Sequence, residues 1–141
     1  MTTTAGYEYF DVEADVGVRA WGVDPADAFA QAALAVLALG VAPAEVEERE
    51  TRDVRAQGAS IEELLVAWIN ECVYVHEIEG FAVHRVSVGA LGAAVVHGSL
   101  HGEELDANRH RLGTVVKGAT HHHVSVAGTA RGWEVSLIVD V

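Results

Sequence analysis

The amino-acid sequence predicts an α+β protein in which two helices pack on one face of a largely antiparallel sheet. Two observations support this prediction: segments of alternating apolar and polar residues, typical of strands, and two apolar stripes with helical spacing. These segments follow one another in the order ββαβα and then four strands, an order typical of layered α+β domains. A chain of 141 residues is long enough to build one sizeable core, so we expect a single domain over residues 1–141.

Both helices are predicted from the residues at their beginnings. In the first, Asp24 stands at the N-cap position and Pro25 at the first helical position, where its missing N–H costs nothing. In the second, Ser60 and Glu63 form a capping-box pattern, and the apolar stripe that follows ends near Gly80. These local signals indicate two amphipathic helices with structural apolar faces.

Seven strands are predicted from period-two alternation. They are expected at residues 7–12, 16–22, 46–57, 81–91, 93–101, 119–127 and 132–141. In the last strand, alternation places Val139 and Val141 on the buried face and Asp140 on the opposite face. The carboxylate of Asp140 is therefore expected to be available to a ligand.

Composition and charge narrow the classes of function. The formal net charge is −12 and Lys117 is the only lysine, which argues against a direct grip on a phosphate backbone and favours a basic protein surface or bound cations. The first residues do not form a signal sequence and no apolar run reaches membrane-spanning length, so we expect a soluble cytoplasmic protein without membrane contact. Cys72 is the only cysteine, which excludes a disulfide within the monomer and predicts a core residue.

Two acids near opposite ends of the chain suggest a cation site. Asp15 precedes the second strand and Asp140 lies in the last one; each by itself is typical of a turn or of a solvated terminus. If the two strands are neighbours, both carboxylates and the main-chain or terminal oxygens of Val141 supply hard ligands for a divalent ion. Such an ion would also offset the repulsion between clustered carboxylates.

Histidines offer a second hypothesis, a zinc-dependent hydrolase. The triplet at residues 121–123 is internal, and strand alternation is expected to send His122 to the opposite face from its neighbours. His97 and His101 share a face and are expected to lie on the surface. No further ligand stands at a spacing typical of zinc, and no nucleophile elbow or phosphate loop is present. A third hypothesis, motivated by the acidic composition, is a chaperone-like binding module.

The sequence also resembles a known family, the archeases, over about residues 7–141. The resemblance rests on the segments Ala14–Gly22, Ala28–Ala33, Glu63–Glu71, Val116–Lys117 with Thr120 and His122, and Val139–Val141. Each segment alone is modest, whereas their order and separations together are specific.

The resemblance implies an accessory protein rather than an enzyme. Archeases bind a divalent metal, expected to be calcium, and activate RtcB-type tRNA-splicing RNA ligases by promoting guanylylation and multiple turnover. They associate with tRNA only through the ligase. By this resemblance Asp15, Asp140 and Val141 are the metal ligands, and Lys117 and His122 occupy polar positions beside the pocket.

The chain departs from the family pattern beside the predicted ligands. Val12 and Glu13 stand where the family has His-Thr, so a polar partner is lost and Glu13 becomes a possible pocket contact. By alternation Glu13 is expected to share a strand face with Asp15. Val115 stands where an acid is common. These changes concern the strength of ligase activation more than the fold.

Overall fold

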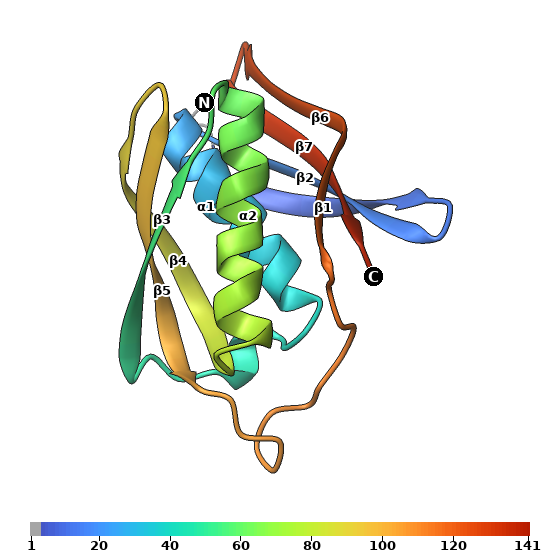
Figure 1. Cartoon of the computed structure of the whole chain (residues 1–141), viewed down its shortest axis with the longest axis vertical. Helices are drawn as coiled ribbons and strands as arrows, with labels where there is room; N and C mark the ends of the chain where they lie inside the picture. Colours follow the sequence, from blue (N-terminus) through green and yellow to red (C-terminus); the bar gives the residue numbers. More distant parts are fainter. Residues whose placement is uncertain (1–3) are drawn as a thin grey trace.

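The computed structural model describes residues 4–141, and its elements follow the predicted order (Figure 1). They are β1 (Gly6–Val12), β2 (Asp15–Gly22), α1 (Pro25–Ala38), the 3-10 helix η1 (Pro43–Glu45), β3 (Glu50–Gln57), α2 (Ile61–Glu77), β4 (Phe81–Leu91), β5 (Val95–Glu104), β6 (Gly118–Thr129) and β7 (Gly132–Asp140). None of the helices in this part of the chain is long and apolar enough to cross a membrane.

The strands form two antiparallel sheets, one of four strands in the order β1-β2-β7-β6 and one of three in the order β3-β5-β4. Figure 1 shows the two helices between these sheets, and each helix packs on both of them. The α+β class, the antiparallel pairing and the element order are confirmed. The expected single sheet, with both helices on one of its faces, is replaced by this three-layer arrangement.

The apolar surface of the helices explains the second sheet. Most of α1 is buried, and it packs on β2 from one sheet and on β4 from the other. A helix that is apolar around most of its circumference needs protein on more than one side. The two helices are joined where the Trp68 indole N–H donates to the carbonyl of Phe29 at 3.0 Å. Cys72 lies in this core as predicted, and burial raises the pKa of its thiol.

The predicted helix beginnings are confirmed by their hydrogen bonds. The Asp24 carboxylate accepts the N–H of Asp27 at 2.8 Å, and the Ser60 hydroxyl accepts the N–H of Glu63 at 3.2 Å. The Glu63 carboxylate in turn accepts the N–H of Ala59 at 3.0 Å. These bonds satisfy amides that the helices leave without an internal partner.

The third strand is shorter than predicted. The sequence indicated a strand over 46–57, whereas β3 begins at Glu50. Before it, residues 43–45 form η1, and the N–H of Glu47 donates to the Glu103 carboxylate at 2.8 Å rather than to a strand carbonyl. The N–H of Arg49 is the first to bond β5, at the Gly102 carbonyl.

Candidate functional site

The first and last parts of the chain meet at one rung of the four-stranded sheet. Strands β2 and β7 are antiparallel neighbours, and their register places Asp15 directly opposite Asp140. On the outer sides of this pair, Val12 lies opposite Asp15 and Gly118 opposite Asp140. Residues opposite each other in a sheet project from the same face, so the two carboxylates share a face of the sheet. The expected pairing of the two strands is confirmed.

The two carboxylates lack partners that would offset their charge. Within residues 4–141, neither Asp15 nor Asp140 takes part in an ion pair or a side-chain hydrogen bond. Asp15 is half-buried and Asp140 is exposed. Cβ atoms of directly opposite residues lie about 4.5–5.5 Å apart, and like charges in such positions destabilise the sheet. A cation between the two side chains would turn this repulsion into attraction.

The donor set fits a hard divalent ion that takes part of its shell from main-chain oxygens and water. Two carboxylates are the preferred side-chain ligands of calcium, which accepts six to eight oxygens in flexible geometry. Residues 4–141 contain no group of three His, Cys, Asp or Glu side chains suited to a metal. Any further protein ligand at this rung would therefore be a carbonyl oxygen. Val141 follows directly after Asp140, the last residue of β7.

Two of the predictions about neighbouring residues were wrong. Glu13 does not share a strand face with Asp15, because Glu13 and Ala14 form the turn of the β1–β2 hairpin. Ala14 has a φ of 64°, in the left-handed region, which breaks the alternation between positions 13 and 15. Val141 is 36% exposed rather than buried, because the strand ends at Asp140.

An aromatic ring lies over the sheet two rungs from the acid pair, where Phe10 is opposite Gly17. A Cβ atom at Gly17 would lie 2.2 Å from Cε2 of Phe10, so only glycine leaves room for the ring there. The Arg19 guanidinium stacks on Phe10 at 5.0 Å from the ring centroid. Arg19 also pairs with Glu8 at 2.8 Å and with Glu134 at 3.1 Å. This arginine therefore neutralises other acids of the same sheet face.

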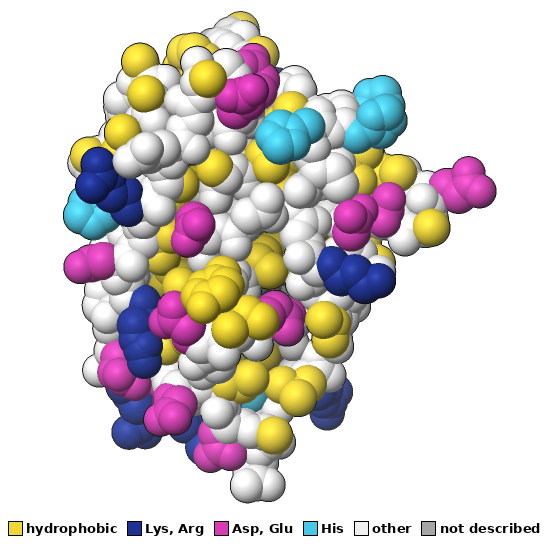
Figure 2. Space-filling view, in the orientation of Figure 1, with side chains coloured by type: hydrophobic (Ala, Val, Ile, Leu, Met, Phe, Trp, Pro, Cys, Tyr) yellow, Lys and Arg dark blue, Asp and Glu magenta, His cyan; other side chains and the backbone are white. Residues whose placement is uncertain are grey.

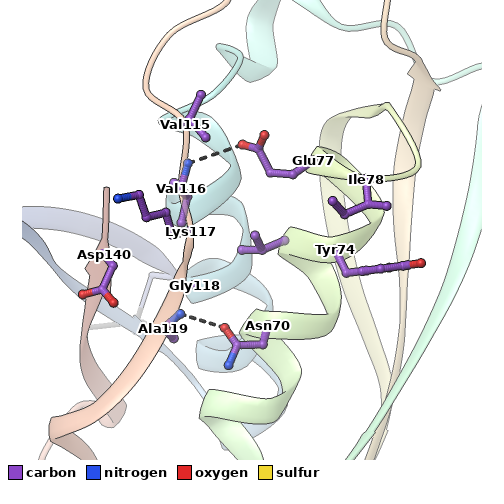
Figure 3. Close-up of a pocket in the computed structure, with 11 residues that line it drawn as sticks. Asn70, Tyr74, Glu77, Ile78, Val115, Val116, Lys117, Gly118, Ala119 and Asp140 are labelled. Atoms are coloured by element: carbon purple, nitrogen blue, oxygen red, sulfur yellow. Dashed lines mark hydrogen bonds between the residues drawn. The ribbon is translucent and has the colours of Figure 1, made fainter.

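A cavity of about 670 Å³ opens beside Asp140, between α2 and the segment that leads into β6 (Figure 3). It is lined by Asn70, Val73, Tyr74, Glu77, Ile78, Val115, Val116, Lys117, Gly118, Ala119 and Asp140. Lys117 thus lies in the same cavity wall as Asp140, and its N–H donates to the Asp140 carbonyl at 2.9 Å. The structure brings these two predicted residues together.

Side chains of α2 hold this wall of the cavity in place. The amide oxygen of Asn70 accepts the N–H of Ala119 at 2.7 Å, and the Glu77 carboxylate accepts the N–H of Val116 at 3.4 Å (Figure 3). From the sequence, Asn70 is notable only as a member of Glu63–Glu71, one of the segments that carry the family resemblance. Its role could not be read from spacing because its partner is 49 residues away.

The histidine triplet lies elsewhere, in an irregular part of β6. The register of β6 against β7 jumps between Thr120 and Ser125, and His123 has a φ of 58°. The expected alternation of His122 with its neighbours therefore fails, and its ring instead contacts that of His123 at 4.1 Å between centroids. All three side chains are exposed and none lines the cavity beside Asp140. This arrangement does not favour the zinc hydrolase.

The other two histidines considered as a pair, His97 and His101, differ in exposure. His97 is exposed, as predicted. His101 is only partly exposed, because it links three strands: its Nδ1 lies 3.2 Å from the Thr51 hydroxyl and its Nε2 lies 2.9 Å from the Ser87 hydroxyl. His101 is thus a cross-strand contact of the three-stranded sheet.

Sequence reasoning missed a buried carboxylate near the end of β5, just before the loop that leads to the cavity. The Glu103 side chain is only 4% exposed, and Arg109 donates to it at 2.6 and 3.1 Å. His110 Nε2 lies 3.1 Å from the same carboxylate, and the Glu47 amide is bonded to it as well. The hydrogen bonds from Arg109 and then from Glu47 lower the pKa of Glu103 to about 2. This cluster fixes the first part of the 105–117 loop.

These features define a small α+β protein with an acidic site at the junction of its first and last strands. Residues 7–141 match the model of the Archease protein family (MTH1598/TM1083). The chain belongs to this family, as the resemblance in its sequence indicated.

Individual relatives agree over nearly the whole length. The chain is 32% identical over 137 residues to the protein archease of Sulfurisphaera tokodaii, covering 96% of this chain and 98% of that one. It is 29% identical over 139 residues to the protein archease of Pyrococcus furiosus, with the same coverage. The solution structure of Methanobacterium thermoautotrophicum protein 1598 superposes with a TM-score of 0.80 at 26% identity, covering 96% of this chain and 99% of that one.

Proposed function

We propose that this protein is a non-catalytic accessory factor that binds a divalent ion and activates an RtcB-type tRNA-splicing RNA ligase in the cytoplasm. The observation that supports the metal site is the placement of Asp15 directly opposite Asp140, where no cation from residues 4–141 pairs with either carboxylate. Membership of the archease family supports the class of partner. The activity on the ligase is promotion of guanylylation, which permits multiple turnover.

In this proposal the two carboxylates and the carbonyl oxygen of Val141 hold the ion, with water completing its shell. Calcium is the expected ion because all of these donors are hard oxygens. When bound, the ion supplies a positive centre at the tip of a strongly acidic molecule. Lys117, in the cavity wall beside Asp140, adds the charge of an ammonium group that can attract a phosphate.

Two other predicted contact residues, Glu13 and His122, lie away from the acid pair and are not assigned as metal ligands. Glu13 lies exposed in the hairpin turn, and His122 lies exposed in the irregular part of β6. Both could contact a partner, but neither belongs to the rung that holds the acid pair. A net charge of −12 opposes direct contact with RNA, so association with tRNA is indirect and runs through the ligase.

The proposal is tested in a ligation assay in which the ligase concentration is lower than the concentration of RNA ends, so that multiple turnover can be measured. Wild-type protein is expected to convert a single turnover into many, and Asp15→Asn or Asp140→Asn to reduce this stimulation about 10- to 100-fold, as changes around bound metals commonly do. Asp11→Asn is the matched control, since Asp11 is an exposed acid of β1 opposite Val16. Undiminished stimulation by both folded variants would contradict the assigned site.

A further inference from the structure

Large exposed hydrophobic side chains gather at the cavity beside Asp140. Residues 4–141 contain seven such side chains, and three of them line this one cavity. These are Tyr74, Ile78 and Val115, which are 52%, 69% and 64% exposed. Figure 2 shows hydrophobic side chains clustered over the lower half of α2 and toward the neighbouring segments. Clustered exposed apolar surface of this kind indicates a contact with another molecule.

Acidic groups flank the same apolar surface. Glu77 and Asp140 line the cavity, and Lys117 is the only basic residue among its lining side chains. In Figure 2 acidic side chains lie on both sides of the hydrophobic cluster. Because apolar contacts supply affinity while complementary charge selects the partner, the surface fits a ligand that is both apolar and basic.

The hydrogen bonds of the cavity wall decide what shape of ligand fits. The amides of Val116 and Ala119 already donate to Glu77 and Asn70, so they are not available to an added β-strand. The opposite wall is the exposed stripe of α2, where Asn70, Tyr74 and Ile78 follow one another at intervals of four residues. A helix lying beside this stripe can insert side chains into the cavity without needing free backbone groups.

We infer that this cavity is a docking groove for a basic amphipathic helix of the ligase partner. An apolar side chain of that helix lies between Tyr74, Ile78 and Val115, and an arginine or lysine pairs with Glu77. A volume of about 670 Å³ is sufficient for several side chains. The identity of the partner rests on the proposed function. The groove itself is inferred from the exposed hydrophobic side chains and the hydrogen bonds of the cavity wall.

The test measures direct binding of the full-length protein to the purified ligase at fixed calcium. Ile78→Glu and Val115→Glu are each expected to weaken binding at least about 10-fold, because a carboxylate would have to be desolvated in an apolar contact. Val23→Glu is the matched control: Val23 is 55% exposed and lies outside the cavity, so binding should stay within about twofold, as for surface changes elsewhere. Ile78→Ala provides a milder variant, and circular dichroism confirms folding.

A second set of binding measurements tests the contribution of the Glu77 charge. Glu77→Gln keeps an oxygen that accepts the Val116 amide but removes the carboxylate. Its complex with the ligase is expected to be several-fold weaker, and its affinity is expected to fall less steeply with sodium chloride than that of the wild type. An unchanged salt dependence would overturn the predicted pairing with a basic side chain.

The outcomes separate the groove from the proposed function. If the wild type binds and activates the ligase and the Ile78 and Val115 variants do so equally well, the groove assignment is overturned while the accessory function stands. If the wild type does not bind the ligase at all, the accessory function is overturned and the assigned occupant with it. If ultracentrifugation shows a dimer that Ile78→Glu dissociates, a second copy of this chain covers the groove and the ligase helix is excluded.

Discussion

At the residue scale, two kinds of acid in this protein have opposite surroundings. Asp15 and Asp140 face each other with no cation from the described chain. Glu103 is enclosed by donors instead, chiefly Arg109 and the Glu47 amide, with His110 beside it. Only the second arrangement satisfies its carboxylate within the protein, so it stabilises the fold. The first arrangement leaves both carboxylates open to water or to a ligand.

The surroundings of Glu103 predict a specific dependence of stability on pH. Its pKa is about 2 in the folded protein, whereas an unfolded glutamate has a pKa of about 4.3. Because the folded pKa is the lower one, the stabilising contribution is fully present above about pH 4.3 and is lost as the pH falls toward about 2.

Glu103→Gln should therefore destabilise the protein at pH 7 by roughly 1–3 kcal/mol, because Arg109 loses its charged acceptor. Urea unfolding of both proteins should show this difference shrinking between about pH 5 and pH 2, where the unfolded glutamate takes up its proton first. Glu104→Gln, at the exposed neighbouring position, is the control and should change stability by less than about 0.5 kcal/mol. A difference that stays constant with pH would contradict the assignment of charge to this cluster.

At the scale of elements, helix α2 organises the candidate site without contributing to the acid pair. Two of its side chains, Asn70 and Glu77, accept amides of the segment that leads into β6. The same segment donates the Lys117 amide to Asp140. The position of β6 beside Asp140 therefore depends on a helix from the other side of the cavity.

Asn70→Ala is expected to loosen the beginning of β6. Loss of a hydrogen bond worth about 1 kcal/mol should speed hydrogen exchange of the Ala119 amide about 5- to 10-fold. Asn70→Asp retains an acceptor and should preserve protection at that amide. Exchange measured residue by residue by NMR would show this, and equal protection in the alanine variant would mean that β7 alone holds the strand.

How far the sequence predicts these elements depends on the range of the contacts involved. The helices were predicted well because Asp24 and Ser60 bond amides three residues away. The acid pair was predicted because period-two alternation fixes the face of Asp140, and only the pairing of two strands had to be supplied. Local patterns were sufficient in these cases.

Other features required partners that are distant in the sequence. The split into two sheets depends on which strands pair, and alternation does not contain that information. The alternation rule failed at Ala14 and at His123, where left-handed backbone interrupts it. The second interruption lies where the register of β6 against β7 shifts, between Thr120 and Ser125. Glu103 was missed although Arg109 is only six residues away, because its burial and its bond from the Glu47 amide, 56 residues earlier, depend on the tertiary fold.

At the scale of the whole molecule, the net negative charge and the strand topology both bear on the junction of β2 and β7. The chain has a formal net charge of −12, which destabilises any compact state through self-repulsion. The site that would relieve part of this repulsion lies where β2 and β7, central strands of the four-stranded sheet, come together. Binding of a cation there should therefore strengthen the contact between distant parts of the chain as well as reduce repulsion.

Calcium is accordingly expected to stabilise the protein in two separable ways. Any salt screens exposed charges, with a Debye length of about 10 Å at 0.1 M, and should raise the melting temperature of all variants alike. Specific binding adds about 2.7 kcal/mol when calcium is present at about 100 times its dissociation constant. For a domain of this size that corresponds to roughly 5–15 °C.

Calorimetric scans at equal ionic strength, with sodium chloride or with calcium chloride, distinguish the two contributions. The wild type and the control Asp11→Asn should show the additional calcium shift, because Asp11 lies opposite Val16 rather than in the acid pair. The double variant Asp15→Asn/Asp140→Asn should be more stable than the wild type without calcium, since its repulsion is removed, and should lose the additional shift. An additional shift of equal size in all three proteins would place the calcium site away from the junction of β2 and β7.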